Sequence, residues 1–317
     1  MTLALLFSPQ GSQVVGMGRE LAEHSDGARA VFEEADATLG WSVSDTCWVG
    51  PQDRLNDTRQ TQPCLLTVSV AALRALGERV ELEPSVVAGH SVGEYAALVA
   101  AGVLDLAAAL RLVAQRAELM ARADADGGMA AVIGLDRATV EAVVDSVGRP
   151  TDLVMANDNA PGQSVISGRL AALAAVEEPL RAAGARRVLR LPVSGAFHSP
   201  LMASVAEDLA DALASETWRD ASVPIISNVT AEPLVDAERI RSLLAEQVRA
   251  PVEWVRSVER MVADGIETAV ECGPGSALSG MVKRIAPGIR TANVGDVAGL
   301  ETAAGIVRGV ATAPASV

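Results

Sequence analysis

The chain has 317 residues, of which 50% are hydrophobic and 21% charged, and its net charge is −14 at pH 7. This composition excludes a disordered or collagen-like chain, and the overall negative field opposes binding to nucleic acid or to an anionic membrane. The longest apolar stretch is shorter than the ~20 residues of a membrane span, and the first residues lack a signal-peptide pattern, so we expect a globular cytoplasmic protein.

The first part of the chain alternates strands and helices. Short apolar runs predict buried strands over residues 3–7 and 85–88, and Ala/Leu-rich segments predict helices over 92–101 and 106–123. The second strand is followed by a sharp turn at Gly89 and then by a helix, so this segment has a strand–turn–helix pattern.

A different pattern begins near residue 129, where the order of elements becomes β-α-β-β-α-β. The predicted strands cover 130–134, 153–156, 163–167 and 187–191, and the predicted helices cover 137–147 and 170–183. This order is that of a ferredoxin-like unit, inserted here between two parts of a larger α/β domain. The first pattern then resumes, with strands over 224–227 and 268–271 and helices over 240–247 and 255–264.

The sequence Gly89-His90-Ser91-Val92-Gly93 is a GxSxG motif between a predicted strand and a predicted helix. In a nucleophile elbow the two glycines let strand and helix approach closely, and the serine hydroxyl is presented at the helix N-terminus. The N–H of Val92 and the helix dipole then face a developing oxyanion. Ser91 is therefore the candidate nucleophile.

A serine nucleophile needs a base, and the chain has three histidines. His24 lies in a polar stretch typical of a surface, and His90 is expected to point away from Ser91 because of the geometry of the turn. His198 remains, in a loop of small residues after a predicted strand, and it is the candidate base. The three cysteines have no metal-ligand spacing, so we expect buried thiols, no disulfide and no metal site.

Five segments resemble the malonyl-CoA:acyl carrier protein transacylases, and they occur in the family's order over about residues 3–290. They are the elbow with Glu94-Tyr95, Gln10-Gly11-Ser12-Gln13, Gln60-Thr61-Gln62-Pro63, Ser194-Gly195-Ala196-Phe197-His198-Ser199 and Glu271-Cys272-Gly273-Pro274-Gly275. The resemblance implies an α/β-hydrolase-like catalytic subdomain over 1–125 and 192–310 with a ferredoxin-like small subdomain over 126–191. We expect a flexible tail over 311–317.

The resemblance also implies the chemistry. A malonyl group would pass from malonyl-CoA to Ser91 and then to the phosphopantetheine thiol of an acyl carrier protein. His198 would be the base, oriented by the backbone carbonyl of Gln247, with the N–H groups of Gln10 and Val92 as the oxyanion hole. No cofactor beyond the substrates' own CoA and phosphopantetheine is expected, and we expect a monomer.

Further residues are matched to the substrate site by the same resemblance. Arg116 would pair with the free malonyl carboxylate, although an arginine on a helix is ordinarily solvated. Phe197 would crowd a substituent on the malonyl α-carbon, where methylmalonyl-selecting relatives usually carry serine, or would only pack in the core. Gln62 would line the cleft or cap a helix, and Asn157 and Asn159 would lie in a loop at the cleft or be turn formers.

One departure from the family concerns the loop before Gln10, where this chain has Ser8-Pro9 in place of the usual Pro-Gly. Pro9 lacks an N–H, but the N–H of Gln10 remains. Because the chain is acidic and the carrier and CoA are anionic, we expect a local basic docking face, formed by Arg186, Arg187, Arg190, Lys283 and Arg284.

Three other functions are consistent with some of these residues. One is transfer of a different or substituted acyl unit in a specialised polyketide pathway. Another is a serine esterase or thioesterase, which the absence of an evident Asp-containing triad loop disfavours. The third is a non-catalytic carrier-docking subunit, which the presence of Ser91, His198 and Arg116 disfavours.

Overall fold

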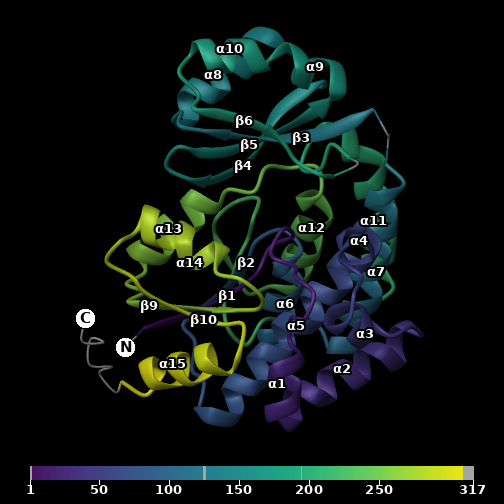
Figure 1. Cartoon of the computed structure of the whole chain (residues 1–317), viewed down its shortest axis with the longest axis vertical. Coiled ribbons are helices and arrows are strands. Elements are labelled where there is room, and N and C mark those ends of the chain that lie inside the picture. Colours follow the sequence, from purple (N-terminus) through teal and green to yellow (C-terminus); the bar gives the residue numbers. More distant parts are fainter. Residues whose placement is uncertain (1, 124–125, 194, 310–317) are drawn as a thin grey trace.

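The computed structural model describes residues 2–123, 126–193 and 195–309, and within these ranges it is a mixed α/β protein with two sheets (Figure 1). The predicted tail over 311–317 and Ser194 of the histidine loop lie outside the described residues. No helix in the described ranges is long and apolar enough to cross a membrane.

The larger sheet has six described strands in the order β10-β9-β1-β2-β7-β8. Its strands are β1 (Leu3–Phe7), β2 (Val86–Gly89), β7 (Ile225–Ile226), β8 (Pro233–Leu234), β9 (Thr268–Cys272) and β10 (Arg290–Val294). All neighbours are parallel except β7 and β8. Phe7 is in register with both Gly89 and Cys272, so three strands end at the same edge and the loops that follow them lie side by side there.

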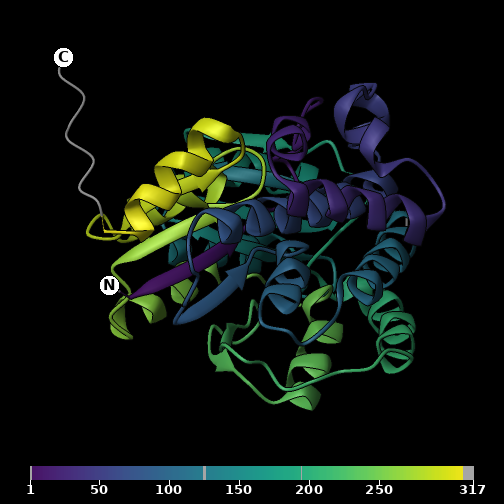
Figure 2. The same cartoon turned by 90° about the horizontal axis from the view of Figure 1, so that it is seen from below.

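Helices lie on both sides of this sheet (Figure 2). Alternate residues of β1 belong to two different apolar clusters: Leu5 and Phe7 to one, Ala4 and Leu6 to the other. Because both faces are buried, the strand is apolar throughout rather than alternating, as predicted from its short apolar run. The surrounding helices are α1 (Arg19–His24), α2 (Asp26–Leu39), α3 (Val43–Trp48), α4 (Gln52–Asn56), α5 (Thr58–Arg79), α6 (Gly93–Ala100), α7 (Leu106–Ala121), α11 (Ala203–Ala214), α12 (Ala237–Gln247), α13 (Trp254–Ala263), α14 (Ala277–Ile285) and α15 (Val297–Val307), with a 3-10 turn over Pro200–Met202.

The smaller sheet has four described strands in the order β4-β5-β3-β6, all antiparallel to their neighbours. They are β3 (Gly127–Ile133), β4 (Leu153–Ala160), β5 (Gln163–Arg169) and β6 (Arg187–Arg190). Helices α8 (Arg137–Val147), α9 (Leu170–Ala175) and α10 (Glu177–Ala182) cover the face of this sheet that points away from the larger sheet (Figure 1).

Polar contacts connect the two sheets. Arg137 of α8 donates from Nη1 to Glu253 at 2.5 Å and to Asp158 of β4 at 3.2 Å. Arg284 of α14 donates to Gln163 Oε1 at 2.5 Å. The contacts of Arg137 with Glu253 and of Arg284 with Gln163 join the smaller sheet and its helix α8 to the start of α13 and to α14.

One predicted helix is divided in the structure, and one long helix was not predicted. The helix predicted over 170–183 is two helices, which meet at Val176. Pro179 has no N–H to donate to the carbonyl of Ala175, so a continuous helix would lose a hydrogen bond there. Helix α5 was not predicted, because its middle is buried on all sides and therefore lacks an amphipathic period.

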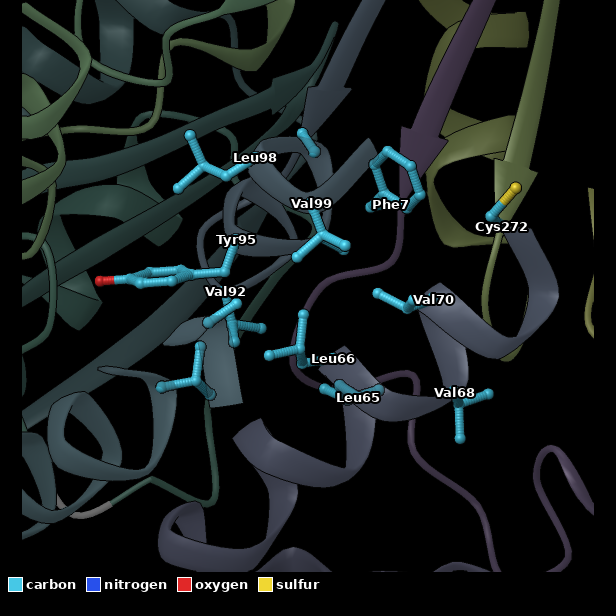
Figure 3. Close-up of a cluster of buried hydrophobic side chains, with 14 of the residues drawn as sticks. Phe7, Leu65, Leu66, Val68, Val70, Val92, Tyr95, Leu98, Val99 and Cys272 are labelled. Atoms are coloured by element: carbon cyan, nitrogen blue, oxygen red, sulfur yellow. The ribbon is translucent and has the colours of Figure 1, made fainter. Parts of the chain in front are cut away.

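Helix α5 packs against Val92 and α6. Figure 3 shows Leu66 and Val70 of α5 near Val92 and Val99, in a cluster that also includes Phe7 at the end of β1. This packing holds the segment after β2 in a fixed place.

Candidate active site

Ser91 lies in the turn between β2 and α6, and its φ of 53° is in the left-handed region. A Cβ added to Gly89 would lie 2.0 Å from the backbone carbonyl carbon of Gly93, and one added to Gly93 would lie 2.2 Å from the carbonyl oxygen of Phe7. Both contacts are too close for any side chain. The two glycines of the motif are therefore required by the close approach of strand and helix, as the sequence predicted.

The strained turn is held by Asn228, which sequence reasoning did not single out. The backbone N–H of Ser91 donates to Asn228 Oδ1 at 2.6 Å, and Asn228 Nδ2 donates to the carbonyl of Gly89 at 2.6 Å. Asn228 is buried and follows β7, the neighbour of β2 in the sheet. A polar residue directly after a buried parallel strand was the available signal, because the carboxyl ends of such strands meet at one edge.

We expect Asn228→Ala to weaken the elbow. The variant leaves the N–H of Ser91 and the C=O of Gly89 without their partner, at a cost of about 1–3 kcal/mol of unfolding free energy for such buried groups. Misplacement of Ser91 should also lower the rate at which Ser91 is acylated by malonyl-CoA, the donor that the motif resemblance implies, at least about tenfold. Rapid-quench acylation and thermal unfolding measure the two effects, with Val229→Ala as the control. Wild-type acylation in a folded Asn228→Ala protein would show that Asn228 does not position Ser91.

His198 is the histidine that meets Ser91. Its Nε2 lies 2.8 Å from Ser91 Oγ, and its Nδ1 lies 2.8 Å from the carbonyl oxygen of Gln247 and 3.2 Å from that of Ala250. A carbonyl only accepts, so the proton is on Nδ1 and Nε2 is free to accept the proton of Ser91. Burial, followed by the positive charge of Arg116, lowers the pKa of His198 to about 3, which keeps the imidazole neutral at physiological pH.

The other two histidines have the environments predicted from the sequence. His24 is exposed at the end of α1. His90 points away from Ser91: its Nε2 is 2.8 Å from Asn159 Oδ1, and its ring contacts Trp254 at 5.5 Å between centroids. All three cysteines are buried free thiols.

Arg116 is not a solvated helix residue, since it is only 1% exposed. Its Nη1 donates to Gln62 Oε1 at 2.5 Å, and its Nη2 donates to Ser91 Oγ at 3.1 Å and to Gln247 Oε1 at 3.0 Å. These acceptors are neutral, its Nε has no partner among the described groups, and burial lowers its pKa. A buried guanidinium without a carboxylate among its hydrogen-bond partners is costly, so this site is suited to a ligand that brings a negative charge.

A cavity of about 240 Å³ opens beside Ser91, between the edge of the large sheet and the small sheet. Its lining includes Gln10, Phe197, Asn157 and Asn159, together with apolar side chains such as Met120 and Met129. Ser91 and His198 line it as well, so most of the predicted site residues converge here. Four others are buried and do not line the cavity: Val92, which is the N-cap of α6, and Gln62, Arg116 and Gln247.

Three predicted placements need correction. Gln62 does not cap a helix; it lies inside α5, where it is buried against Arg116. Asn157 and Asn159 lie in β4 and not in a loop, and the turn begins only at Pro161. The pairing of β4 with β5 has two register shifts in this stretch, and both asparagines line the cavity.

The loop that contains Ser8 and Pro9 is attached to the Glu271 motif. Ser8 Oγ donates to Glu271 Oε1 at 3.4 Å, and the same carboxyl group accepts from the backbone N–H groups of Leu278 and Ser279 at 3.1 and 2.8 Å. A Cβ on Gly273 would lie 2.6 Å from Ser8 Oγ, so only glycine fits there. Ser8 is thus part of the loop's attachment to β9.

The model of the acyl transferase domain family matches residues 4–302 of this chain. The chain therefore belongs to the acyl transferase family, as the motifs predicted. It is 41% identical, over 95% of its own length and 96% of the relative, to the malonyl CoA-acyl carrier protein transacylase of Bacillus subtilis (strain 168). The resemblance stated from the motifs is confirmed.

Solved structures of malonyl-transferring enzymes have a closely similar fold. An acyl carrier protein S-malonyltransferase from Vibrio cholerae superposes with a TM-score of 0.93 at 38% identity, covering 96% of this chain and 100% of that one. A type II PKS malonyl-transacylase, solved in complex with its acyl-carrier protein, gives a TM-score of 0.92 at 39% identity, covering 96% and 99%.

Proposed function

We propose that this chain transfers a malonyl group from malonyl-CoA, through an ester on Ser91, to the phosphopantetheine thiol of an acyl carrier protein for fatty acid or polyketide synthesis. The observation that carries this proposal is the buried guanidinium of Arg116, which contacts Ser91 Oγ and has only neutral protein acceptors. A malonyl thioester brings the missing carboxylate next to the nucleophile, and a guanidinium offers it two parallel donors. The relatives with malonyl-transferring names support the same substrate.

In the first half-reaction His198 Nε2 accepts the proton of Ser91 while Oγ attacks the thioester carbon. The negative charge on the former carbonyl oxygen is stabilised by the N–H groups of Gln10 and Val92. The C–S bond then breaks, and the proton on His198 passes to the sulfur of CoA. The carbonyl of Gln247 stabilises the transient imidazolium through Nδ1–H, in place of an acidic third residue.

In the second half-reaction the carrier thiol gives its proton to His198 and its sulfur attacks the malonyl ester. The C–O bond to Ser91 breaks, and Oγ recovers a proton from His198. Throughout both steps Arg116 would hold the distal carboxylate, so that the same orientation serves acylation and transfer.

The esterase alternative predicts a different fate for the acyl-enzyme. We expect malonyl-Ser91 to form with malonyl-CoA, to persist in water and to disappear on addition of a holo carrier protein. Intact-mass spectrometry of both proteins follows this directly. Rapid loss to water without transfer would favour a hydrolase, and no labelling by malonyl-CoA would favour a non-catalytic docking subunit.

Phe197 is the candidate for discrimination against substituted malonyl groups. It is 4% exposed and lines the cavity, and a Cβ on Gly195 would lie 2.5 Å from its ring, so the ring keeps this position only because residue 195 is glycine. We expect Phe197→Ser to raise the acylation rate with methylmalonyl-CoA relative to malonyl-CoA about tenfold, because the pocket gains room for one methyl group. Phe197→Leu is the control that keeps an apolar side chain. An unchanged ratio in Phe197→Ser would assign the ring to core packing alone.

The finer description of the fold belongs to the same proposal: an α/β-hydrolase-like subdomain over 1–125 and 192–310 with a ferredoxin-like insert over 126–191. The strand order β4-β5-β3-β6 supports the insert, since the first and third strands of a ferredoxin-like unit pair at the centre of its sheet. The parallel strands around β1, with helices on both faces, support the larger part.

Other expectations stay predictions: a monomer, a cytoplasmic location and a reaction without metal or bound cofactor. The proposed basic docking face also stays a prediction. Its members are exposed on two separate parts of the molecule, with Arg187 and Arg190 on β6 and Lys283 and Arg284 on α14.

A further inference from the structure

Glu94 is a buried acid for which the mechanism above has no use. It lies in the first turn of α6, directly after the elbow, and is 4% exposed. Its Oε2 accepts from Gln247 Nε2 at 2.5 Å. Burial raises the pKa of Glu94 to about 7, while the Gln247 amide, the backbone of Asn228 and the charge of Arg116 act in the opposite direction.

Gln247 connects Glu94 to the reaction site through both ends of its amide. Its Nε2 donates to Glu94 and also to the carbonyl of Ser91 at 3.0 Å, while its Oε1 accepts from Arg116 Nη2 at 3.0 Å. The side chain is 1% exposed, so water does not offer a substitute for these partners.

The direction of this amide is decided by its neighbours. A flipped amide would place its NH₂ group against the guanidinium, donor against donor, and its oxygen against a carboxylate and a carbonyl. Arg116 and the carbonyl of Ser91 each favour the observed direction by one hydrogen bond, and Glu94 adds the shortest one, at the NH₂ end of the amide. If position 94 had no acceptor, the Gln247 amide would be held less firmly. Arg116 Nη2 would then have a less well-oriented hydrogen-bond acceptor in Gln247 Oε1.

We propose that Glu94 is a positioning residue for acyl selection: its carboxyl group fixes the Gln247 amide, which in turn aims the Arg116 guanidinium at the distal carboxylate of the substrate. This inference rests on the proposed function, because it concerns the same pocket and the same donor. It assigns to Glu94 no contact with the substrate.

The test compares Glu94→Met, which fills the space without an acceptor, with Glu94→Gln, whose amide oxygen can accept from Gln247. The measured quantity is the ratio of acylation kcat/KM for malonyl-CoA to that for acetyl-CoA. We expect the ratio to fall about tenfold in Glu94→Met, the effect of losing a hydrogen bond to a charged network, and to change less than about twofold in Glu94→Gln. A purely structural role would lower the rates with both donors and leave the ratio unchanged, which would overturn the proposal.

A double-mutant cycle then asks whether Glu94 acts through Arg116. In the Arg116→Ala background, Glu94→Met should leave the ratio unchanged, because the guanidinium to be aimed is gone. If Glu94→Met lowered the malonyl-to-acetyl ratio by the same factor with and without Arg116, the two residues would act independently and the proposal would be overturned. If Glu94→Met does not fold, Gln247→Met replaces it: this variant keeps the backbone carbonyl bonded to His198 and removes only the amide, and the same loss of ratio is expected. An unchanged ratio in folded Gln247→Met would also contradict the proposal.

Different results would refute the proposed function and the role of Glu94. A wild-type protein that malonyl-CoA does not acylate would refute the proposed function. A wild-type protein that prefers malonyl-CoA, with the same preference in Glu94→Met, would refute only the role of Glu94.

Discussion

Ser91→Ala is expected to abolish acylation by malonyl-CoA. In the proposed mechanism the hydroxyl of Ser91 is the nucleophile of the first half-reaction and the leaving group of the second, and its contacts with His198 Nε2 at 2.8 Å and Arg116 Nη2 at 3.1 Å both favour the alkoxide. Loss of the nucleophile from such a unit lowers kcat by about 10⁴-fold or more. Release of CoA in a single-turnover experiment, together with the intact mass of the protein, measures the effect.

Ser85→Ala is the matched control, because Ser85 is exposed just before β2 and far from the elbow along the strand. It should be acylated at the wild-type rate. If Ser91→Ala were still labelled at the wild-type rate, the nucleophile would be another residue, and peptide mapping would identify it.

Arg116→Ala is expected to remove the preference for malonyl-CoA. In this variant the distal carboxylate enters a buried site without its partner, and kcat/KM for malonyl-CoA should fall about 10²–10³-fold, as for truncation of one member of a buried charge pair. Acetyl-CoA has no carboxylate to leave unpaired, so its relative rate should rise. Acylation rates with both donors, measured separately, give the ratio.

The control for this experiment is Arg111→Ala on the same helix. Arg111 has a side chain that is 51% exposed and pairs with Glu216 at 2.8 Å, outside the cavity. It should leave the malonyl-to-acetyl ratio unchanged. If Arg116→Ala also kept the wild-type ratio, the guanidinium would not select the substrate. The buried guanidinium would then no longer support the proposed function.

The sequence alone predicted the elbow and its base, because both depend on local or countable features. The glycines around Ser91 are needed for steric reasons that act within a few residues, and the number of histidines left only His198. The βαββαβ order of the small sheet was likewise visible from short apolar runs. The α/β class of the chain follows from such local patterns.

Arg116, Gln62 and Gln247 were reached only through the family resemblance. They come from α7, α5 and α12, and the contact between them is created by tertiary packing that no local pattern encodes. Glu94 and Asn228 were not predicted to be functional at all. An Asn after a short strand, or a Glu in the first turn of a helix, is typical of ordinary turns and helix ends, so its burial against the elbow becomes evident only in three dimensions.

The central claim is tested most directly by offering both donors to one enzyme. Wild-type protein is mixed briefly with equal concentrations of malonyl-CoA and acetyl-CoA, digested, and its peptides are analysed by mass spectrometry. We predict a malonyl group on the peptide that contains Ser91 and little acetyl group anywhere. A predominant acetyl adduct on Ser91, or a malonyl group carried by a different peptide, would contradict the account.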